Sequence, residues 1–251
     1  KKLKLVADNS YVLEVRAFNM LTVRIGMFFD GTGNNTFNAE AAKKETHDWA
    51  FQCSSSEQKT ALAAWCSKRP AQNSADNEIT NVQKLHDLYM DDGSQFGNTL
   101  ILKQYIEGIG TTNDGHSFSP TQDNDMGLGL GVGETGVDAK VKKGCEAAVN
   151  SILDYLPQGY DGIGCFQFDV FGFSRGAAAA RHFTNQVIQG EDGYFGQAVK
   201  KKHLPLSDPF DWKNPQQSQF TFVGIFDTVA AIGDDLDAHN QNDERKIRLA
   251  V

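Results

Sequence analysis

The chain has 251 residues, of which 40% are hydrophobic and 22% are charged, and its formal net charge is −8. This length and composition allow one large globular α/β domain or two small ones. The acidic balance excludes a typical nucleic-acid-binding protein and non-specific adhesion to anionic lipid surfaces. No apolar run reaches about 18 residues, so we expect no transmembrane helix, and no segment near the start has the form of a signal peptide.

The first third of the chain predicts two strands and a polar insertion. Residues 11–18 alternate between apolar and polar side chains, which predicts an edge strand, and residues 21–29 predict a buried strand. The buried strand runs into Asp30-Gly-Thr-Gly-Asn-Asn35, a turn of the kind that binds ligands at the carboxyl edge of open α/β sheets. Residues 38–78 are polar and predict a surface insertion with one helix near 57–68.

The middle of the chain predicts a helix, a strand and a glycine-rich loop. Residues 78–89 form an amphipathic helix pattern capped by Thr80 or Asn81. Its apolar positions, at a spacing of three, are Ile79, Val82, Leu85 and Leu88. Residues 99–106 predict a strand that leads into Glu107-Gly-Ile-Gly-Thr111. The loop at 127–133 lacks the Gly-Lys-Ser/Thr ending of a phosphate-binding loop, so we interpret it as a flexible loop or lid.

The last part of the chain alternates helices and strands. Helices are predicted at 138–155 and 175–187, strands at 166–171 and 220–226, and a loop-rich excursion at 190–219. This alternation predicts a mostly parallel sheet flanked by helices, with loop-rich insertions, in one α/β domain over 1–251. Residues 247–251 have the pattern of a further strand, so we expect this domain to continue beyond Val251.

The four cysteines give little support to a metal site. Cys53, Cys66, Cys145 and Cys165 lack C-x-x-C spacing, which argues against zinc. Cys145 and Cys165 lie in apolar runs and are expected in the core. Cys53 and Cys66 flank a polar segment, and a disulfide between them stays open for an oxidising compartment.

The segment that organises the chemistry is Gly172-Phe-Ser-Arg-Gly176, a G-x-S-x-G pattern between a predicted strand and a predicted helix. In this setting the serine stands on a strained turn at the tip of the sheet, and the glycines let neighbouring backbone pass closely. We therefore expect Ser174 to be a nucleophile. The alternative is that Ser174 only caps the following helix, but a cap does not explain glycines on both sides.

A serine hydroxyl needs a base and an orienting carboxylate. Asp227 follows a predicted strand and comes after Ser174, as in the Ser, Asp, His order of α/β-hydrolases; alternatively, it caps a helix. The backbone N–H of Arg175, with those of Gly31 and Thr32, predicts an oxyanion hole. The Asp30 side chain would hold that loop together or bind a cation, but one carboxylate does not make a metal site, and no cofactor is expected.

The sequence leaves the base open among six histidines. His47, His86 and His116 precede the serine, and His182 lies roughly 12 Å further along the predicted helix. His203 belongs to a basic patch. His239 has the right order but follows Asp227 too closely for the intervening helix and strand. We therefore expect the base beyond Val251, with His239 as the alternative within the chain.

Several motifs, taken together and in this order, match one family. They are Phe28-Phe-Asp-Gly-Thr-Gly-Asn-Asn35, Thr80-Asn-Val82, Gly108-Ile-Gly-Thr111, Gly172-Phe-Ser-Arg-Gly-Ala177 with Ala180-Arg181, and Phe226-Asp-Thr-Val229. The chain thus resembles the phospholipase-type α/β-hydrolase domain of bacterial type VI secretion lipase effectors. Asp243-Glu-Arg245, which follows His239, is similar to the charged stretch that follows the family histidine.

The resemblance implies a Ser-Asp-His hydrolase, with Ser174 as nucleophile and Asp227 as carboxylate, that cleaves acyl esters of membrane glycerophospholipids (phospholipase A type). It also implies an antibacterial effector, made in the producer cytoplasm without a signal peptide and delivered to the target-cell periplasm. Its implied partners are an immunity protein and a spike protein of the secretion machinery. The alternatives are a small-ester hydrolase on the same scaffold, or a catalytically silent α/β binding module.

Overall fold

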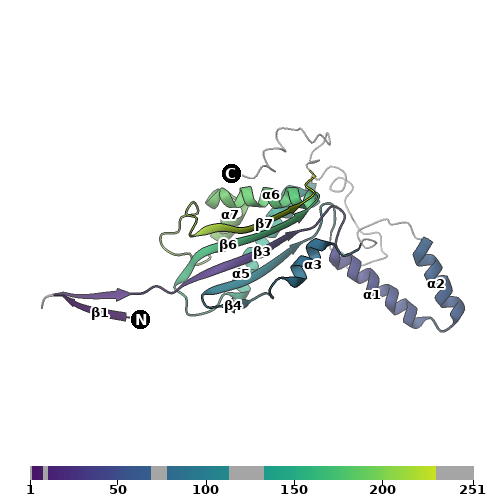
Figure 1. Cartoon of the computed structure of the whole chain (residues 1–251), viewed down its shortest axis with the longest axis horizontal. Helices are drawn as coiled ribbons and strands as arrows, with labels where there is room; N and C mark the ends of the chain where they lie inside the picture. The colour runs from purple at the N-terminus through teal and green to yellow at the C-terminus, as the bar shows by residue number, and fades with distance from the viewer. Residues whose placement is uncertain (1, 8–10, 69–77, 113–132, 230–251) are drawn as a thin grey trace.

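The computed structural model describes residues 2–7, 11–68, 78–112 and 133–229. Its centre is a twisted sheet with the strand order β4-β5-β3-β6-β7 (Figure 1). The parallel strands are β3 (Met20–Phe29), β5 (Thr99–Ile106), β6 (Gly162–Phe173) and β7 (Ser218–Phe226), and β4 (Ser94–Phe96) is an antiparallel edge strand. The predicted mostly parallel α/β sheet is confirmed.

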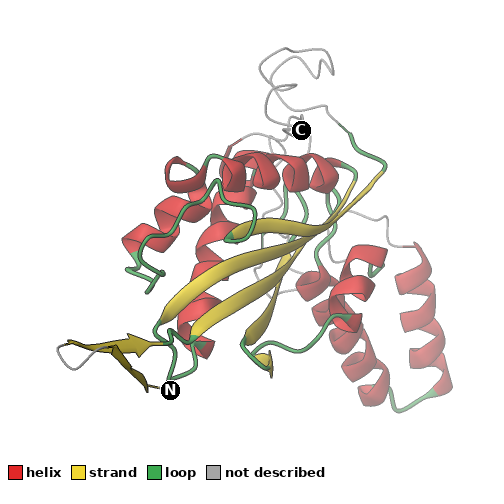
Figure 2. Cartoon of the chain, turned by 60° about the vertical axis from the view of Figure 1, so that its left-hand side comes forward, coloured by secondary structure: helices red, strands yellow, loops and turns green. Residues whose placement is uncertain are grey.

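Helices cover both faces of this sheet (Figure 2). On one face lie α5 (Val137–Tyr155), α6 (Arg175–Ile188) and α7 (Tyr194–Lys201), and on the other lies α3 (Asn81–Leu88). Two short 3₁₀ helices, Gly133–Thr135 and Gly190–Asp192, precede α5 and α7. Because β3, β5, β6 and β7 run parallel, the loops that follow these four strands gather at one edge of the sheet.

The core follows from the alternation of side chains along the strands. On β3, Ile25, Met27 and Phe29 point into the large cluster under α5 and α6, whereas Phe28 packs with Val82 on the α3 face. A strand with both faces covered must be apolar on both sides. This explains why β3 is a continuous apolar run at its carboxyl end, with positions 25–29 all buried.

Two further units project from this body. Strands β1 (Lys2–Ala7) and β2 (Tyr11–Arg16) form an antiparallel pair of their own, and helices α1 (Thr36–Gln52) and α2 (Ser56–Lys68) form a hairpin at the opposite end of the molecule (Figure 1). The strand predicted at 11–18 therefore exists as β2, and it pairs with β1 in a two-stranded sheet that is separate from the main sheet.

The sequence missed two helices and misplaced one side chain. It predicted one helix within 38–78, where the structure has α1 and α2, and loops at 190–219, where α7 forms. Thr80 is the N-cap of α3, as predicted, since its side chain accepts a hydrogen bond from the Gln83 N–H. Leu88, predicted on the apolar face of α3, is 84% exposed because the helix ends there and the chain turns away.

All four cysteines are free thiols, so the disulfide that the sequence allowed between Cys53 and Cys66 is not formed in this structure. Cys145 and Cys165 are buried, as predicted for core residues, and burial raises the pKa of both thiols. Within the described ranges, no helix combines the length and the apolarity that crossing a membrane requires.

Candidate active site

Ser174 sits on a strained turn between β6 and α6. Its backbone has φ 56° and ψ −128°, a positive φ that is uncommon outside glycine and costs about 1–3 kcal/mol. Its side chain makes no capping hydrogen bond to α6, and no described residue hydrogen-bonds its hydroxyl. Ser174 thus occupies the N-cap position of α6 without a side-chain cap, and the geometry matches the strand-to-helix turn that carries the nucleophile of α/β-hydrolases.

The two glycines beside Ser174 are required by close backbone approach. A Cβ on Gly172 would lie 2.6 Å from the Gly176 carbonyl oxygen, within the same turn. A Cβ on Gly176 would lie 2.2 Å from the carbonyl oxygen of Asp30. The second contact presses the serine turn against the end of β3, so the loop that follows β3 lies beside Ser174.

Asp227 lies on a second strained turn, directly after β7, with φ 47° and an exposed side chain. Two backbone hydrogen bonds join this turn to the serine turn. The Ser174 N–H donates to the Phe226 carbonyl at 3.0 Å, and the Val229 N–H donates to the Ser174 carbonyl at 3.2 Å. The structure thus places the predicted nucleophile and the predicted carboxylate on adjoining, mutually fixed turns.

The loop after β3 is built around the buried carboxylate of Asp30. Its Oδ1 accepts the Gly31 N–H at 2.7 Å, and its Oδ2 accepts the Tyr105 hydroxyl at 2.6 Å. Burial raises the pKa of Asp30, although the hydrogen bonds from Tyr105, Thr80 and the Gly31 amide lower it in part. Of the two roles predicted for Asp30, the structure thus shows the one in which its side chain holds the loop together.

The N–H groups of Gly31 and Thr32, both predicted for the oxyanion hole, differ in their hydrogen bonds. The Gly31 N–H is already committed to Asp30, whereas the Thr32 N–H donates to no described residue. The Thr32 hydroxyl accepts a hydrogen bond from Nε of Arg175 at 2.8 Å, which holds the loop against the first residue of α6. Thr32 and Arg175 are therefore brought together beside Ser174, and the hydrogen bond of Gly31 to Asp30 fixes the loop that carries Thr32.

A second glycine loop, which follows β5, braces the first. The Gly108 N–H donates to the Asn34 carbonyl at 2.8 Å, and a Cβ on Gly108 would lie 1.9 Å from the Gly31 carbonyl oxygen. Lys140, on α5, pairs with Glu107 at 3.0 Å and donates to the Thr111 carbonyl at 2.7 Å. Residues 107–111 thus serve as a scaffold for the loop beside Ser174.

The described histidines lie elsewhere. His182 is buried on α6, with Nε2 2.9 Å from Oδ1 of Asp138, and His86 packs against the rings of Phe28 and Tyr105. His47 and His203 are exposed to solvent. His116 and His239, the loop at 127–132 and the strand predicted at 247–251 lie outside the described residues.

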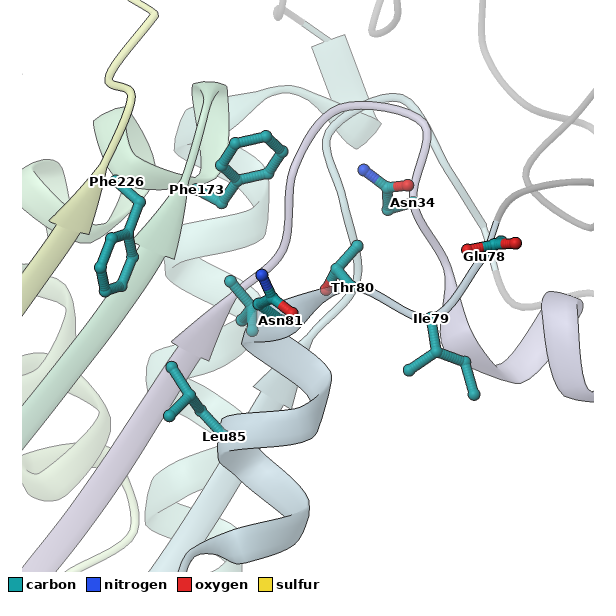
Figure 3. A pocket seen from close by; sticks show the side chains of 9 residues that line it. Asn34, Glu78, Ile79, Thr80, Asn81, Leu85, Phe173 and Phe226 are labelled. Carbon is teal, nitrogen blue, oxygen red and sulfur yellow. The ribbon is translucent and has the colours of Figure 1, made fainter.

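A pocket of about 530 Å³ opens beside the two strained turns (Figure 3). Its walls are Phe173 and Phe226, the residues directly before Ser174 and Asp227, and the start of α3 with Ile79, Val82 and Leu85. Asn34, Glu78, Thr80 and Asn81 add polar groups. Sequence reasoning missed this pocket, although an aromatic residue before both site residues was a usable signal.

No group of three or more His, Cys, Asp or Glu side chains within the described ranges could hold a metal ion. Asp227 and Asp30, the two carboxylates of the site, have different surroundings. The Asp227 side chain is exposed to solvent, whereas the Asp30 side chain accepts hydrogen bonds from the Gly31 N–H and the Tyr105 hydroxyl.

Comparison with models of protein families finds no match, and comparison with curated proteins finds none either. Among solved structures, the chain is similar to the Tle1 effector bound to the VgrG spike from the Type 6 secretion system. The identity is 27% and the TM-score 0.51, over 90% of this chain and 41% of that one. This similarity agrees with the α/β fold and supports a relationship with type VI secretion effectors.

An uncharacterized protein from Pseudomonas aeruginosa is also similar, at 20% identity and a TM-score of 0.35, over 86% of this chain and 31% of that one. That likeness is too weak to carry an argument. The present chain spans less than half the length of either solved structure.

Proposed function

We propose that this chain carries the hydrolytic site of a type VI secretion effector that cleaves acyl esters of membrane glycerophospholipids. The observation that supports it most directly is Ser174 on its positive-φ turn, hydrogen-bonded through backbone to the turn that carries Asp227. The similarity to the Tle1 effector gives this geometry a biological setting. An acyl ester of a phospholipid fits an apolar pocket beside a nucleophile.

In the proposed reaction, Oγ of Ser174 attacks the ester carbonyl while a histidine removes its proton. The carbonyl carbon becomes tetrahedral, and the negative charge that develops on its oxygen accepts hydrogen bonds from the N–H groups of Arg175 and Thr32. The histidine then protonates the departing alcohol, here the lysophospholipid. Water hydrolyses the acyl-enzyme and releases the fatty acid, with Asp227 orienting the imidazole throughout.

The identity of the histidine is part of the proposal: it is His239 or a residue downstream of Val251. In the same way, we propose that the chain is delivered on a VgrG-type spike protein, as the Tle1 neighbour is bound to one. Delivery would lead to the periplasm of the target cell, and an immunity protein would protect the producer. A phospholipid-hydrolysing toxin needs such a partner wherever it can meet the producer's own membranes.

The test combines a fluorophosphonate probe with phospholipids labelled separately at each acyl position, on the longest natural form of the chain. We expect probe labelling and acyl release in the wild type, and loss of both by a factor of about 10⁴ or more in Ser174→Ala, because that variant lacks the nucleophile. The matched control is Ser151→Ala, a serine on α5 whose hydroxyl donates to Gln104 away from the site.

Each outcome assigns a function. Absence of labelling and of hydrolysis in the wild type would contradict the proposal and favour the silent binding module. Hydrolysis of short soluble esters alone would favour the small-ester hydrolase. His239→Ala separates the two candidate bases, because it abolishes labelling only if His239 is the base.

A further inference from the structure

The pocket between α3 and the two strained turns has no role in the bond-breaking steps described above. It is bounded by Phe173 at the end of β6, Phe226 at the end of β7, and the side chains of Ile79, Val82 and Leu85 around the start of α3. Its volume, about 530 Å³, falls within the range of roughly 300–1,000 Å³ that is typical of small-molecule sites.

We propose that this pocket, the acyl pocket, binds the hydrocarbon chain of the ester whose carbonyl Ser174 attacks. The inference rests on the proposed function and deepens it, since it assigns the part of the molecule that sets substrate preference. The acyl pocket would make the enzyme selective for medium and long acyl chains over acetyl esters.

The pocket lies next to Ser174, because Phe173, the residue before it, forms part of the wall. Phe173 and Ser174 are consecutive, and the Ser174 N–H donates to the carbonyl of Phe226 at 3.0 Å. The ring of Phe173 also lies over the loop that holds Thr32, since a Cβ on Gly31 would meet Cδ1 of Phe173 at 2.6 Å. A chain attached to the attacked carbonyl therefore begins beside the ring of Phe173.

The two aromatic residues of the pocket wall are partly exposed to solvent. Phe173 is 37% exposed and Phe226 48% exposed, although both are large aromatic side chains at the carboxyl edge of the sheet. Leaving such surface in water is unfavourable, and a bound hydrocarbon chain removes it from water. Figure 3 shows the two rings on one side of the opening and the start of α3 facing them on the other.

The opposite wall of the pocket, at the start of α3, is held in place by its cap and its packing. The α3 wall is fixed because the Thr80 side chain caps the helix by accepting the Gln83 N–H. Below the pocket, Val82 is buried with Phe28 and Tyr105. A preformed apolar wall binds a chain with little ordering cost, and each buried methylene strengthens binding by up to about fourfold.

Glu78 and Asn81 add polar groups to the acyl pocket. Glu78 is exposed, so water can solvate its carboxylate without entering the apolar part. The apolar residues therefore define a hydrocarbon-binding region between α3 and the ends of β6 and β7.

The experiment narrows the acyl pocket with Leu85→Trp and compares it with Leu88→Trp. Leu88 lies on the same helix but is 84% exposed and does not line the pocket. In the wild type, we expect kcat/KM for an eight-carbon p-nitrophenyl ester to exceed that for the two-carbon ester about tenfold or more. This ratio should fall about tenfold in Leu85→Trp and stay unchanged in Leu88→Trp.

Because Leu85 packs against the small cluster under α3, a second variant guards against misfolding. Phe226→Ala removes one wall without inserting a larger side chain and should lower the same ratio. A binding measurement then removes catalysis altogether: in a Ser174→Ala background, Leu85→Trp should weaken the affinity for a twelve-carbon fluorescent fatty acid about tenfold, and Leu88→Trp should not.

The outcomes separate this inference from the proposed function. Ester hydrolysis with an unchanged ratio in both pocket variants, or equal fatty-acid affinity in Leu85→Trp and Leu88→Trp, would overturn the acyl pocket and leave the hydrolase standing. Selective loss of fatty-acid binding, in a protein that hydrolyses no ester and resists the fluorophosphonate, would show that the pocket binds hydrocarbon chains but would overturn the hydrolase and, with it, the assignment of the pocket to the acyl chain of a substrate.

Discussion

Two buried carboxylates occupy the same level of the sheet and are stabilised in different ways. Asp30 and Glu107 each come directly after a strand, and these strands are paired in parallel with Phe29 opposite Ile106. Asp30 is held by Gly31 and Tyr105, and no described lysine or arginine pairs with it. Glu107 pairs with Lys140 and Lys143 of α5.

The difference in partners shifts the pKa values of the two groups in opposite directions. Burial raises the pKa of both carboxyls, and at Asp30 it outweighs the hydrogen bonds. At Glu107 the charges of Lys140 and Lys143 outweigh burial, and the pKa lies below its ordinary value. The equivalent position on two neighbouring strands therefore carries a carboxyl group with a raised pKa in the loop beside Ser174 and one with a lowered pKa in the loop that braces it.

The largest expected loss of stability comes from removing the charge of Glu107. Glu107→Gln removes the buried carboxylate that pairs with Lys140, whose side chain is 3% exposed, at 3.0 Å. Breaking a buried ion pair by removing one of its partners costs about 3–5 kcal/mol, so we expect the free energy of unfolding, measured in urea at pH 7, to fall by that amount.

Lys143→Gln is the matched control for this change. Its side chain is 60% exposed, and pairs open to water contribute only about 0.2–1 kcal/mol. Equal losses in the two variants would show that burial of Lys140 is not what makes the pair costly to break.

A smaller effect separates the two loops. Gly108→Ala places a Cβ 1.9 Å from the Gly31 carbonyl oxygen and 2.6 Å from that of Asn34. Backbone on both sides cannot yield as a side chain can, so we expect a loss of about 1–3 kcal/mol in thermal or urea unfolding, together with reduced fluorophosphonate labelling of Ser174.

Gly144→Ala is the control for Gly108→Ala. Its Cβ would meet Cγ1 of the Ile106 side chain at 3.0 Å and no backbone atom, and alanine favours a helix over glycine by up to about 1 kcal/mol. We expect little net change. A loss equal to that of Gly108→Ala would contradict the role given to the backbone contact.

The smallest effect compares the two carboxylates by pH. The pKa of Asp30 is raised above its ordinary 3.8, so its contribution to stability is present below that value and is lost as pH rises through the folded pKa. The pKa of Glu107 is lowered from 4.5, so its contribution is present above that value and is lost as pH falls through the folded pKa.

Urea unfolding of the wild type, Asp30→Asn and Glu107→Gln between pH 3 and 7 checks this. The stability advantage of the wild type over Asp30→Asn should shrink with rising pH above about 3.8, and its advantage over Glu107→Gln should grow with pH below about 4.5. Each slope stays within about 1.4 kcal/mol per pH unit, the limit for one proton. Slopes of the same sign would refute the comparison.

The sheet and the serine turn could be predicted because their signals are local. Apolar runs at 21–29, 99–106 and 220–226 match β3, β5 and β7, and glycines on both sides of Ser174 predict the close turn that the structure shows. Helix α1 was missed because its apolar residues form no one-sided stripe. Helix α7 is short and contains Gly196, so its pattern is too weak to stand out.

The sequence alone determined the fold class, the four parallel strands of the main sheet with α3, α5 and α6 between them, and the two residues, Ser174 and Asp227, proposed for the chemistry. These follow from side-chain periodicity and turn chemistry, which act over a few residues. Only the tertiary structure decided that Asp30 takes the Gly31 amide and leaves that of Thr32 open. It also decided that Phe173 and Phe226 face the start of α3 across a pocket. Such contacts join segments that are far apart in the chain, and their geometry is fixed by packing around the sheet.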